Sequence, residues 1–385
     1  MALRHGELRQ PGMTLGQKIW QINWIMFLLI GMCVGVGLGM QYSAANGSWD
    51  PWAHSQLTKY LVFSLGMLIL ALVDIRILMR YAYIVYILSF LLLVVVEIKG
   101  AVGGGATRWI AIPFIGTFQP SELMKFTLVL ALARYFHKLS YEDVGRFSVL
   151  IVPALLVAAP TLLVLRQPDL GTAIVLCGGG VVMFVLAGVR WWKFAVVAIT
   201  GLAASPLIWS MMHPYQKRRV LVLLNPESDP LGSGYHILQS KIAMGAGGLV
   251  GRGFTKGSQS HLNFLPEKQT DFIFTMLAEE FGLIGCLALM SLYLVLMVYG
   301  FGIALRSRNQ FGRLLAMGCI VTFSFYVFIN IAMVMGVIPV VGLPLPLVSY
   351  GGSALLAVMF GFALIMNVYV HRDLRIGRQG ESNGL

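Results

Sequence analysis

Long apolar segments alternate with short polar connections along almost the whole chain of 385 residues. A helix that crosses a bilayer needs about 20 predominantly apolar residues, and ten segments have roughly that length. We therefore predict an all-α, polytopic integral membrane protein in which residues 20–371 form a single membrane domain. The ten predicted spans are 20–42, 57–75, 79–97, 119–137, 146–165, 169–189, 191–211, 271–304, 313–337 and 350–371.

The composition supports the same class of protein. Hydrophobic residues make up 58% of the chain and charged residues 11%, against about 25% charged residues in soluble domains, so a water-soluble globule is excluded. The formal net charge is +12, but the Lys and Arg residues are spread in small groups between apolar segments. This distribution is typical of topology signals and not of a nucleic-acid-binding surface. The four cysteines lie in apolar segments without ligand-type spacing, which argues against disulfides and zinc.

The distribution of positive charge also predicts the orientation of the spans. Ten spans place both termini on one side of the membrane, and 16 of the 28 Lys and Arg residues fall on that side in short segments. Short cytoplasmic segments carry an excess of Lys and Arg. We therefore expect the N-terminal segment 1–19 and the C-terminal segment 372–385 to be cytoplasmic.

The longest connection, residues 212–270 between the seventh and eighth spans, is then extracytoplasmic. Long connections in compact chains are usually functional or disordered, and the Gly-rich stretch with Leu and Ile in this one is too apolar for disorder. We expect a large ordered structure on the outer membrane surface. A second outer connection, 98–118, is expected to fold beside it.

The first span carries Gly31, Gly35 and Gly39 at four-residue intervals. Small residues with this spacing allow two helices in a membrane to approach closely. The pattern predicts a helix-packing contact along this face.

Ionisable residues inside predicted spans are candidates for function because a charge in lipid is costly. The fourth span opens with Gln119-Pro-Ser-Glu-Leu-Met-Lys125, in which Glu122 and Lys125 share a helical face and can pair. A structural ion pair and a substrate contact are equally consistent with this spacing. The sixth span follows Arg166-Gln-Pro-Asp169, and the main expectation for Asp169 is that it complements the helix N-terminus.

The densest group of acidic residues begins the eighth span. We predict Thr270 as the N-cap, with Asp271 in the first turn and either a capping or a catalytic role for this carboxylate. Glu279 and Glu280 lie about 12 to 14 Å further along the helix, and we expect them to make structural hydrogen bonds. An outward-facing set of carboxylates beside Arg and Lys suits a reaction on a lipid-linked anionic substrate, or coupled transport.

Several of these stretches together resemble the SEDS family (shape, elongation, division and sporulation) over nearly the whole chain. The match includes Asn225-Pro-Glu-Ser-Asp-Pro-Leu-Gly-Ser-Gly-Tyr-His236, Phe264-Leu-Pro-Glu-Lys-Gln-Thr-Asp-Phe-Ile-Phe274, Ala278-Glu-Glu-Phe-Gly282, Gln119 to Lys125, Arg166 to Thr172, and Pro344-Leu-Pro-Leu-Val-Ser-Tyr-Gly-Gly-Ser353. The stretch 337–346 is most similar to the rod-shape-determining, or elongation, branch of the family.

The resemblance implies a peptidoglycan glycosyltransferase that polymerises lipid II on the outer face of the bacterial inner membrane. The family's catalytic aspartate falls on Asp271. An inverting reaction needs this base and a cationic site for the diphosphate leaving group. The expected substrate-binding residues are Glu122, Lys125, Arg108, Arg166, Lys217 and Lys268, with Asp169, Glu279 and Glu280 in structural or secondary roles. We expect no tightly bound cofactor, and a divalent ion, Mg²⁺ or Mn²⁺, could assist through ligands that the sequence does not identify.

The resemblance also implies partners: a class B penicillin-binding protein as transpeptidase, the growing glycan strand and the elongation machinery. We expect the transpeptidase to contact the eighth and ninth spans, through the aromatic residues Tyr293, Tyr299, Phe323, Phe325, Tyr326 and Phe328. A flippase for lipid-linked cell-wall precursors is the alternative function. It is disfavoured because the motif residues gather at the outer ends of spans, whereas transporters bind their substrates near the midplane.

Overall fold

The computed structural model describes residues 14–99, 101–103, 106–112, 116–140, 142–212, 217, 221–222, 232–262, 264–265, 267–374 and 376–377. Every predicted span contains helix. The helices are α1 (Leu15–Trp20), α2 (Trp24–Ala44), α3 (Trp52–Leu72), α4 (Ile75–Lys99), α5 (Pro120–His137), α6 (Phe147–Arg166), α7 (Leu170–Leu186), α8 (Trp191–Ala203), α9 (Ser205–Met211), α13 (Ile273–Arg306), α14 (Gln310–Val334) and α15 (Gly352–Val370).

Seven helices of the described chain are long and apolar enough to cross a membrane: α2, α3, α4, α6, α13, α14 and α15. The prediction of a helical, polytopic membrane protein is confirmed at this level. Among the remaining spans, α5 carries Glu122, Lys125 and Arg134, and α7 has 17 residues. The seventh predicted span is divided between α8 and α9, so it is not one continuous helix.

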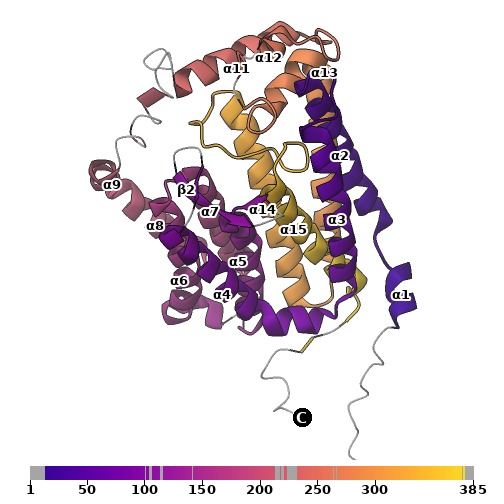
Figure 1. Cartoon of the computed structure of the whole chain (residues 1–385). Coiled ribbons are helices and arrows are strands. Elements are labelled where there is room, and N and C mark those ends of the chain that lie inside the picture. The colour runs from indigo at the N-terminus through magenta and orange to yellow at the C-terminus, as the bar shows by residue number, and fades with distance from the viewer. Residues whose placement is uncertain are drawn as a thin grey trace, which may run out of the picture.

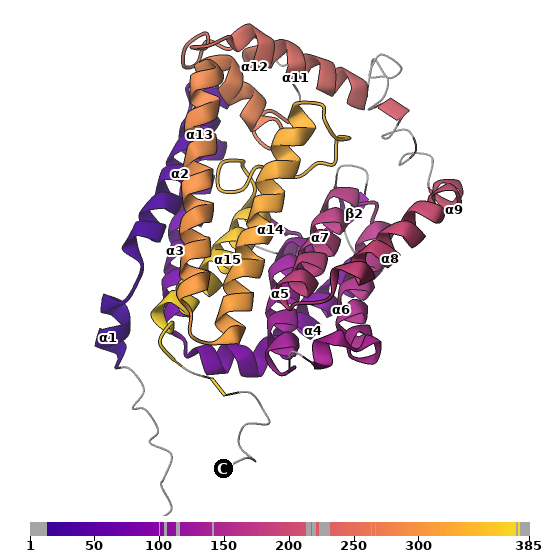
Figure 2. The ribbon, with the colours of Figure 1, turned by 180° about the vertical axis from the view of Figure 1, so that it is seen from behind.

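The helices form one bundle with α5, α14 and α15 near its centre (Figures 1 and 2). Helix α14 packs against α5, α7, α13 and α15, while α3 packs against α15 and α4 against α5. Most of α14 and α15 is buried, whereas less than half of α2, α3, α4 and α6 is buried. The central helices therefore contact protein over most of their surface, and the peripheral helices present apolar side chains outward, as expected for a protein surrounded by lipid.

Only one of the three glycines in the pattern of α2 makes the predicted close helix contact: a Cβ atom at Gly31 would lie 3.2 Å from the hydroxyl oxygen of Tyr60 on α3. A Cβ atom at Gly35 or Gly39 would meet no other atom within 4 Å. A closer approach occurs at Gly37, where a Cβ atom would lie 2.6 Å from the carbonyl oxygen of Val348. Gly37 allows a non-helical segment to pack against α2, while Gly35 is exposed and Gly39 is partly buried with open space beside it.

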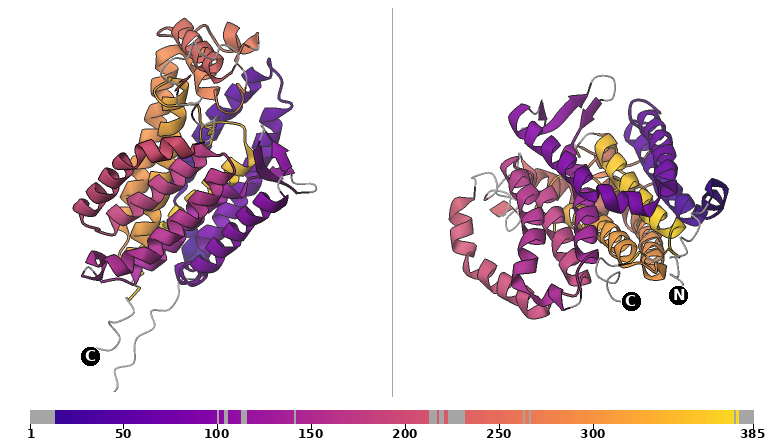
Figure 3. Two further views of the ribbon diagram at one scale, coloured as in Figure 1. Left: turned by 90° about the vertical axis from the view of Figure 1, so that its left-hand side faces the viewer. Right: turned by 90° about the horizontal axis from the view of Figure 1, so that it is seen from below.

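A small antiparallel sheet departs from the all-α prediction. It has the order β1-β2-β3, with β1 (Ala101–Gly103), β2 (Ala106–Ile112) and β3 (Gly116–Phe118), and packs against α4, α5 and α15 (Figure 3). The β-branched and aromatic residues of β2 favour a strand. The segment is short and lies between two long apolar helices, so its period-2 pattern is easily overlooked.

The outer connection contains helices α11 (Ser233–Gly247) and α12 (Ser258–His261). Figure 2 shows α11 running across the end of the bundle, where it packs against α13 and α14. The described part of 212–270 therefore lies over this end of α13 and α14.

Helix α13 is broken near its outer end at Gly282, where φ is +64°. A residue with a side chain rarely adopts this conformation, and the break leaves backbone groups without helical partners. The outer segment 248–253, which we call the clamp, supplies those partners. The N–H groups of Arg252 and Gly253 donate to the carbonyls of Glu279 and Glu280 (both 3.0 Å), and those of Leu283 and Ile284 donate to the carbonyls of Gly248 and Leu249 (2.9 and 3.1 Å).

Candidate active site at the outer end of the bundle

Asp271 lies in the turn that precedes α13 and is partly buried. Helix α13 begins at Ile273 with Phe272 as its N-cap, so the prediction that Thr270 caps the helix is wrong. The Thr270 N–H and hydroxyl both bond to the backbone carbonyl of Glu267 (3.0 and 3.2 Å), which closes the turn before the helix begins. Asp271 is thus held outside the helical hydrogen-bond ladder.

Two side chains fix the backbone on either side of the Asp271 carboxylate. The Ser349 hydroxyl donates to the Thr270 carbonyl (2.5 Å), and the Asn330 amide donates to the Asp271 carbonyl (2.9 Å). The same Asn330 amide donates to the Leu343 carbonyl (2.7 Å), and the neighbouring Gly342 lies beside the Asp271 carboxylate. The position of Asp271 is therefore set by α14 and by the segment 335–351.

The segment 335–351 is non-helical backbone between α14 and α15, and most of its residues from 341 to 349 are buried. Such backbone is tolerated at membrane depth only where protein groups satisfy its polar atoms. Three side chains from distant helices do so: Gln41 donates to the Val348 carbonyl (3.0 Å), Gln56 to the Ser349 carbonyl (3.1 Å) and Tyr293 to the Pro346 carbonyl (2.6 Å). These bonds hold the segment rigidly against the Asp271 turn.

Glu122 and Lys125 form a buried ion pair, with Lys125 Nζ 2.7 Å from Glu122 Oε1. The Tyr326 hydroxyl donates to the other Glu122 oxygen and also contacts Lys125 Nζ, which lies 4.0 Å from the centre of the tyrosine ring. Tyr326 and Asn330 are four residues apart on α14, about 6 Å along its axis. The ion pair therefore lies about one helical turn from the residue that positions Asp271.

Asp169 is the N-cap of α7, and its carboxylate accepts the Thr172 N–H (3.1 Å) and the Gln119 amide (3.0 Å). Arg108 on β2 donates to the carbonyls of Gln167 (2.9 Å) and Pro168 in the turn before this cap. Arg108 and Asp169 thus join the sheet, α5 and α7. The Arg108 guanidinium group therefore donates hydrogen bonds to backbone carbonyls.

The other predicted basic residues do not gather at one point. Arg166 is exposed, and Lys217 Nζ donates to the Ser210 carbonyl (3.3 Å). Lys268 is buried and donates to the Ser260 carbonyl (2.8 Å), and its burial lowers the pKa of its amine. Among Arg108, Arg166, Lys217 and Lys268, only Lys268 shares the turn of Asp271.

Glu279 and Glu280 are buried, and both bond to the outer connection. Glu279 accepts the N–H groups of Gln259 (2.8 Å) and Ser260 (3.2 Å), together with the Ser260 hydroxyl (2.8 Å). Glu280 accepts the hydroxyl of Ser43 and faces the His261 ring nitrogen at 3.3 Å. Both carboxylates therefore fasten α12 to the bundle.

Sequence reasoning missed Asn330, Ser349, Tyr326 and the pair formed by Lys59 and Tyr350. Tyr350 donates its N–H to the Gln269 carbonyl (2.9 Å), and Lys59 Nζ lies 3.3 Å from its hydroxyl. Burial raises the pKa of Tyr350, but hydrogen bonding to Ser55 and the Lys59 charge outweigh it, so the pKa lies below its usual value. A lone amide inside the ninth apolar segment was the available signal for Asn330, because polar groups in membranes are rarely without a role.

The described residues contain no group of three or more His, Cys, Asp or Glu side chains that could hold a metal ion. They therefore do not form a protein cage for the Mg²⁺ or Mn²⁺ considered from the sequence.

Comparison with known proteins identifies the family. Residues 17–374 match the family model of cell cycle proteins that is named for FtsW, RodA and SpoVE. The chain is 45% identical to the peptidoglycan glycosyltransferase MrdB of Escherichia coli K12 over 313 residues, which are 80% of this chain and 83% of MrdB.

Solved structures agree with this assignment. The rod shape determining protein RodA of Thermus thermophilus is 29% identical, with a TM-score of 0.69 over 92% of this chain and 98% of RodA. A chain from a structure described as a peptidoglycan synthase complex that coordinates polymerisation and crosslinking is 32% identical, with a TM-score of 0.79 over 91% of this chain and 98% of that one. The predicted resemblance, including its elongation branch, is confirmed: the chain belongs to the FtsW, RodA and SpoVE family of cell cycle proteins, which is the SEDS family.

Proposed function

We propose that this chain is a peptidoglycan glycosyltransferase that polymerises lipid II during cell elongation, with Asp271 as its catalytic base. One observation carries the assignment of the base. Asp271 is a partly accessible carboxylate whose flanking backbone is fixed by Ser349 and Asn330. A general base has to be held precisely and still reach its substrate.

In the proposed reaction, the 4-hydroxyl of the acceptor GlcNAc attacks the anomeric carbon of the lipid-linked donor. Asp271 accepts the hydroxyl proton as the new glycosidic bond forms, because bond formation makes that proton acidic. The bond from the anomeric carbon to the diphosphate oxygen breaks, and undecaprenyl diphosphate leaves from the opposite face with inversion. Cationic side chains stabilise the diphosphate charge, and Lys59, beside Tyr350, joins the predicted set as a candidate.

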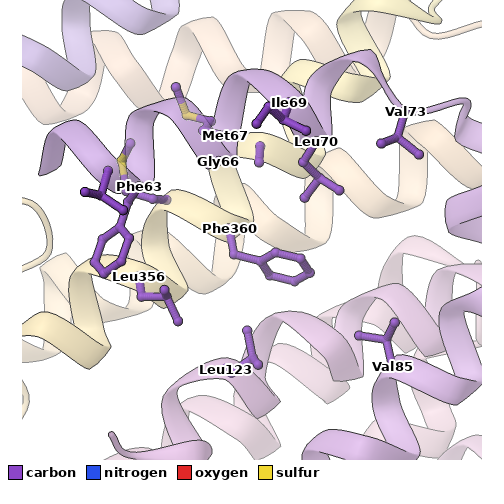
Figure 4. Close-up of a pocket in the computed structure, with 13 residues that line it drawn as sticks. Phe63, Gly66, Met67, Ile69, Leu70, Val73, Val85, Leu123, Leu356 and Phe360 are labelled. Carbon is purple, nitrogen blue, oxygen red and sulfur yellow. The ribbon is translucent and has the colours of Figure 1, made fainter. Parts of the chain in front are cut away.

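An apolar groove suits the lipid tail of a substrate. It has a volume of about 650 Å³ and lies between the pair α3 and α15 and the pair α4 and α5 (Figure 4). All 13 lining residues are apolar, and Phe63 and Phe360 lie on the opposite side from Leu123. Because Leu123 follows Glu122 on α5, a tail in this groove would bring its head group towards the outer end of α5. The buried pair Glu122 and Lys125 does not line this groove, and its proposed contact with the lipid-linked group stays a prediction.

The proposed topology has ten spans. Seven are the longer helices, and the other three are α5, α7 and the divided α8–α9 segment. The charge distribution supports cytoplasmic termini and an extracytoplasmic 212–270 connection in the bacterial inner membrane. A cysteine introduced at Ser258 is expected to react with an impermeant thiol reagent added to intact spheroplasts. Labelling that requires lysis would reverse the orientation.

We propose a class B penicillin-binding protein as partner, bound along α13 and α14 together with the elongation machinery. A groove of about 680 Å³ separates these helices and includes Leu294, Phe328 and Val337. The aromatic residues that the sequence suggested for this contact are largely turned inward: Tyr293, Phe323 and Tyr326 are buried, whereas Phe328 is 67% exposed. Phe328→Glu should therefore reduce co-purification of the transpeptidase, and Phe323→Leu should leave it intact. Unchanged recovery with Phe328→Glu would contradict this docking site.

Purified chain with labelled lipid II distinguishes polymerisation from transport. In detergent, where no membrane barrier exists, the enzyme is expected to form glycan polymer. A flippase would instead move lipid II between the leaflets of liposomes and form no polymer under either condition. Movement without polymer would overturn the proposed function.

A further inference from the structure

A second apolar groove lies between α2 and α13, which run side by side (Figure 1). It has a volume of about 410 Å³ and is lined by apolar side chains and glycines, among them Met32, Gly39, Leu277 and Leu292. It shares no residue with the groove of Figure 4 or with the site around Asp271. This second groove therefore has no part in the proposed reaction.

Aromatic rings close the outer end of this groove. Phe254, from the outer connection, stacks on Tyr42 of α2 with ring centres 6.3 Å apart and packs against Phe281 of α13 at 5.9 Å. Trp49 extends the cluster, 5.8 Å from Tyr42. Partly exposed aromatic rings of this kind gather at the head-group level of a bilayer. A partner's transmembrane helix would have to continue past Phe254, whereas a lipid chain ends at this level.

Two cations flank Phe254 in the sequence at this end of the groove, and the exposed Asp50 follows Trp49. Residues 232–262 contain Lys241, Arg252 and Lys256 but no Asp or Glu. Arg252 and Lys256 are exposed on either side of Phe254. Arg252 bonds to Ser258 and to the Ala246 carbonyl, which leaves further N–H donors on its guanidinium group. Arg252 and Lys256 therefore complement an anionic head group.

We propose that an anionic phospholipid of the outer leaflet binds at this groove. One acyl chain lies between α2 and α13, and the phosphate contacts Arg252 and Lys256. Gly39 keeps the groove open, because a Cβ atom there would meet no protein atom within 4 Å. Since Arg252 and Gly253 are also the clamp residues that bond to the broken helix α13, the bound lipid holds the clamp in place.

Lipid retention by the purified full chain tests this site. The protein is incubated in detergent with phosphatidylglycerol or phosphatidylcholine, and native mass spectrometry counts the lipids that remain bound. The wild type is expected to retain phosphatidylglycerol preferentially. Arg252→Gln with Lys256→Gln should lower that retention about 30-fold, the effect of removing two cations from an anionic lipid surface.

Groove-filling variants test the acyl chain. Gly39→Leu and Ala288→Leu place side chains in the groove and should lower phosphatidylglycerol retention. Gly35→Leu is the matched control, because Gly35 is on the same helix with equally open space but does not line the groove. Equal retention of the two lipids by the wild type, or wild-type retention by both groove variants, would refute the proposal. Loss of transpeptidase co-purification with unchanged lipid retention in Gly39→Leu would identify a protein occupant instead.

Discussion

The outer end of α13 carries two kinds of carboxylate within ten residues. Asp271 is held through its backbone, by Asn330 and Ser349 acting on adjacent carbonyls, and its side chain is partly exposed. Glu279 and Glu280 are held through the carboxylates themselves, which accept bonds from α12, Ser43 and His261. The bonds from Asn330 and Ser349 position Asp271 without themselves occupying its carboxylate oxygens, whereas the bonds at Glu279 and Glu280 use those oxygens.

The largest expected effect is on catalysis at Asp271. Asp271→Asn preserves the size of the side chain and the backbone contacts of the turn but removes basicity, so polymerisation should fall about 100- to 10,000-fold. Folding and lipid II binding should remain close to wild type. Polymerisation rate, thermal unfolding and lipid II binding are measured on the same preparation, with Asp50→Asn as an exposed outer control. A folded Asn variant with near wild-type activity would remove Asp271 from the mechanism.

Next in size is the loss of stability when the buried pair is broken. Lys125→Ala would leave Glu122 uncompensated, and breaking such a pair typically costs about 3 to 5 kcal/mol. We expect expression, unfolding temperature and activity to decrease together. If this variant accumulates and unfolds at the wild-type temperature but is inactive, the pair binds substrate, and the prediction that it stabilises the fold is wrong.

A smaller effect is expected at Glu279. Glu279→Gln places an amide group against the donors of Gln259 and Ser260, and a mismatched buried hydrogen bond costs about 1 to 3 kcal/mol. The unfolding temperature should fall, while the activity of the remaining folded protein is largely kept. A large loss of activity without a change in unfolding would place Glu279 with Asp271 rather than with the outer connection.

The smallest expected effect concerns the positioning of Asp271. Asn330→Leu removes the amide that bonds to the carbonyls of Asp271 and Leu343. The Asp271 carboxylate should then be held less precisely, and the polymerisation rate should fall about tenfold. This loss is smaller than the roughly 100-fold loss expected from a misplacement of about 1 Å. The decisive measurement is the rate per folded molecule at saturating lipid II. An unchanged rate would show that Ser349 and Tyr350 suffice to hold the turn.

Hydropathy predicted where the spans lie because membrane crossing imposes about 20 apolar residues on each helix. Local spacing likewise predicted the pairing of Glu122 with Lys125. The hydrogen bonds that complete the site join residues far apart in sequence, such as Gln56 with Ser349 and Tyr326 with Glu122. No local sequence pattern shows which distant residues will meet. The roles of Tyr326, Ser349 and Asn330 could therefore be recognised only in the folded structure.

Short-range conformation was the other source of error. The start of α13 was misplaced because Thr270 has the chemistry of an N-cap, but its N–H and hydroxyl are used by Glu267. The division of 191–211 into α8 and α9 is likewise invisible in a continuous apolar pattern. At Thr270, the hydrogen bonds that close the turn outweighed the preference of threonine for the N-cap position.

The break in α13 has a consequence for the order of biogenesis. Gly282 breaks the 34-residue α13, so backbone groups beside the break have no partner within the helix itself. The groups that satisfy them belong to residues 248–253, which leave the ribosome before α13 does. The clamp is therefore made before the broken helix, so the partners of its backbone groups are already present when α13 is completed.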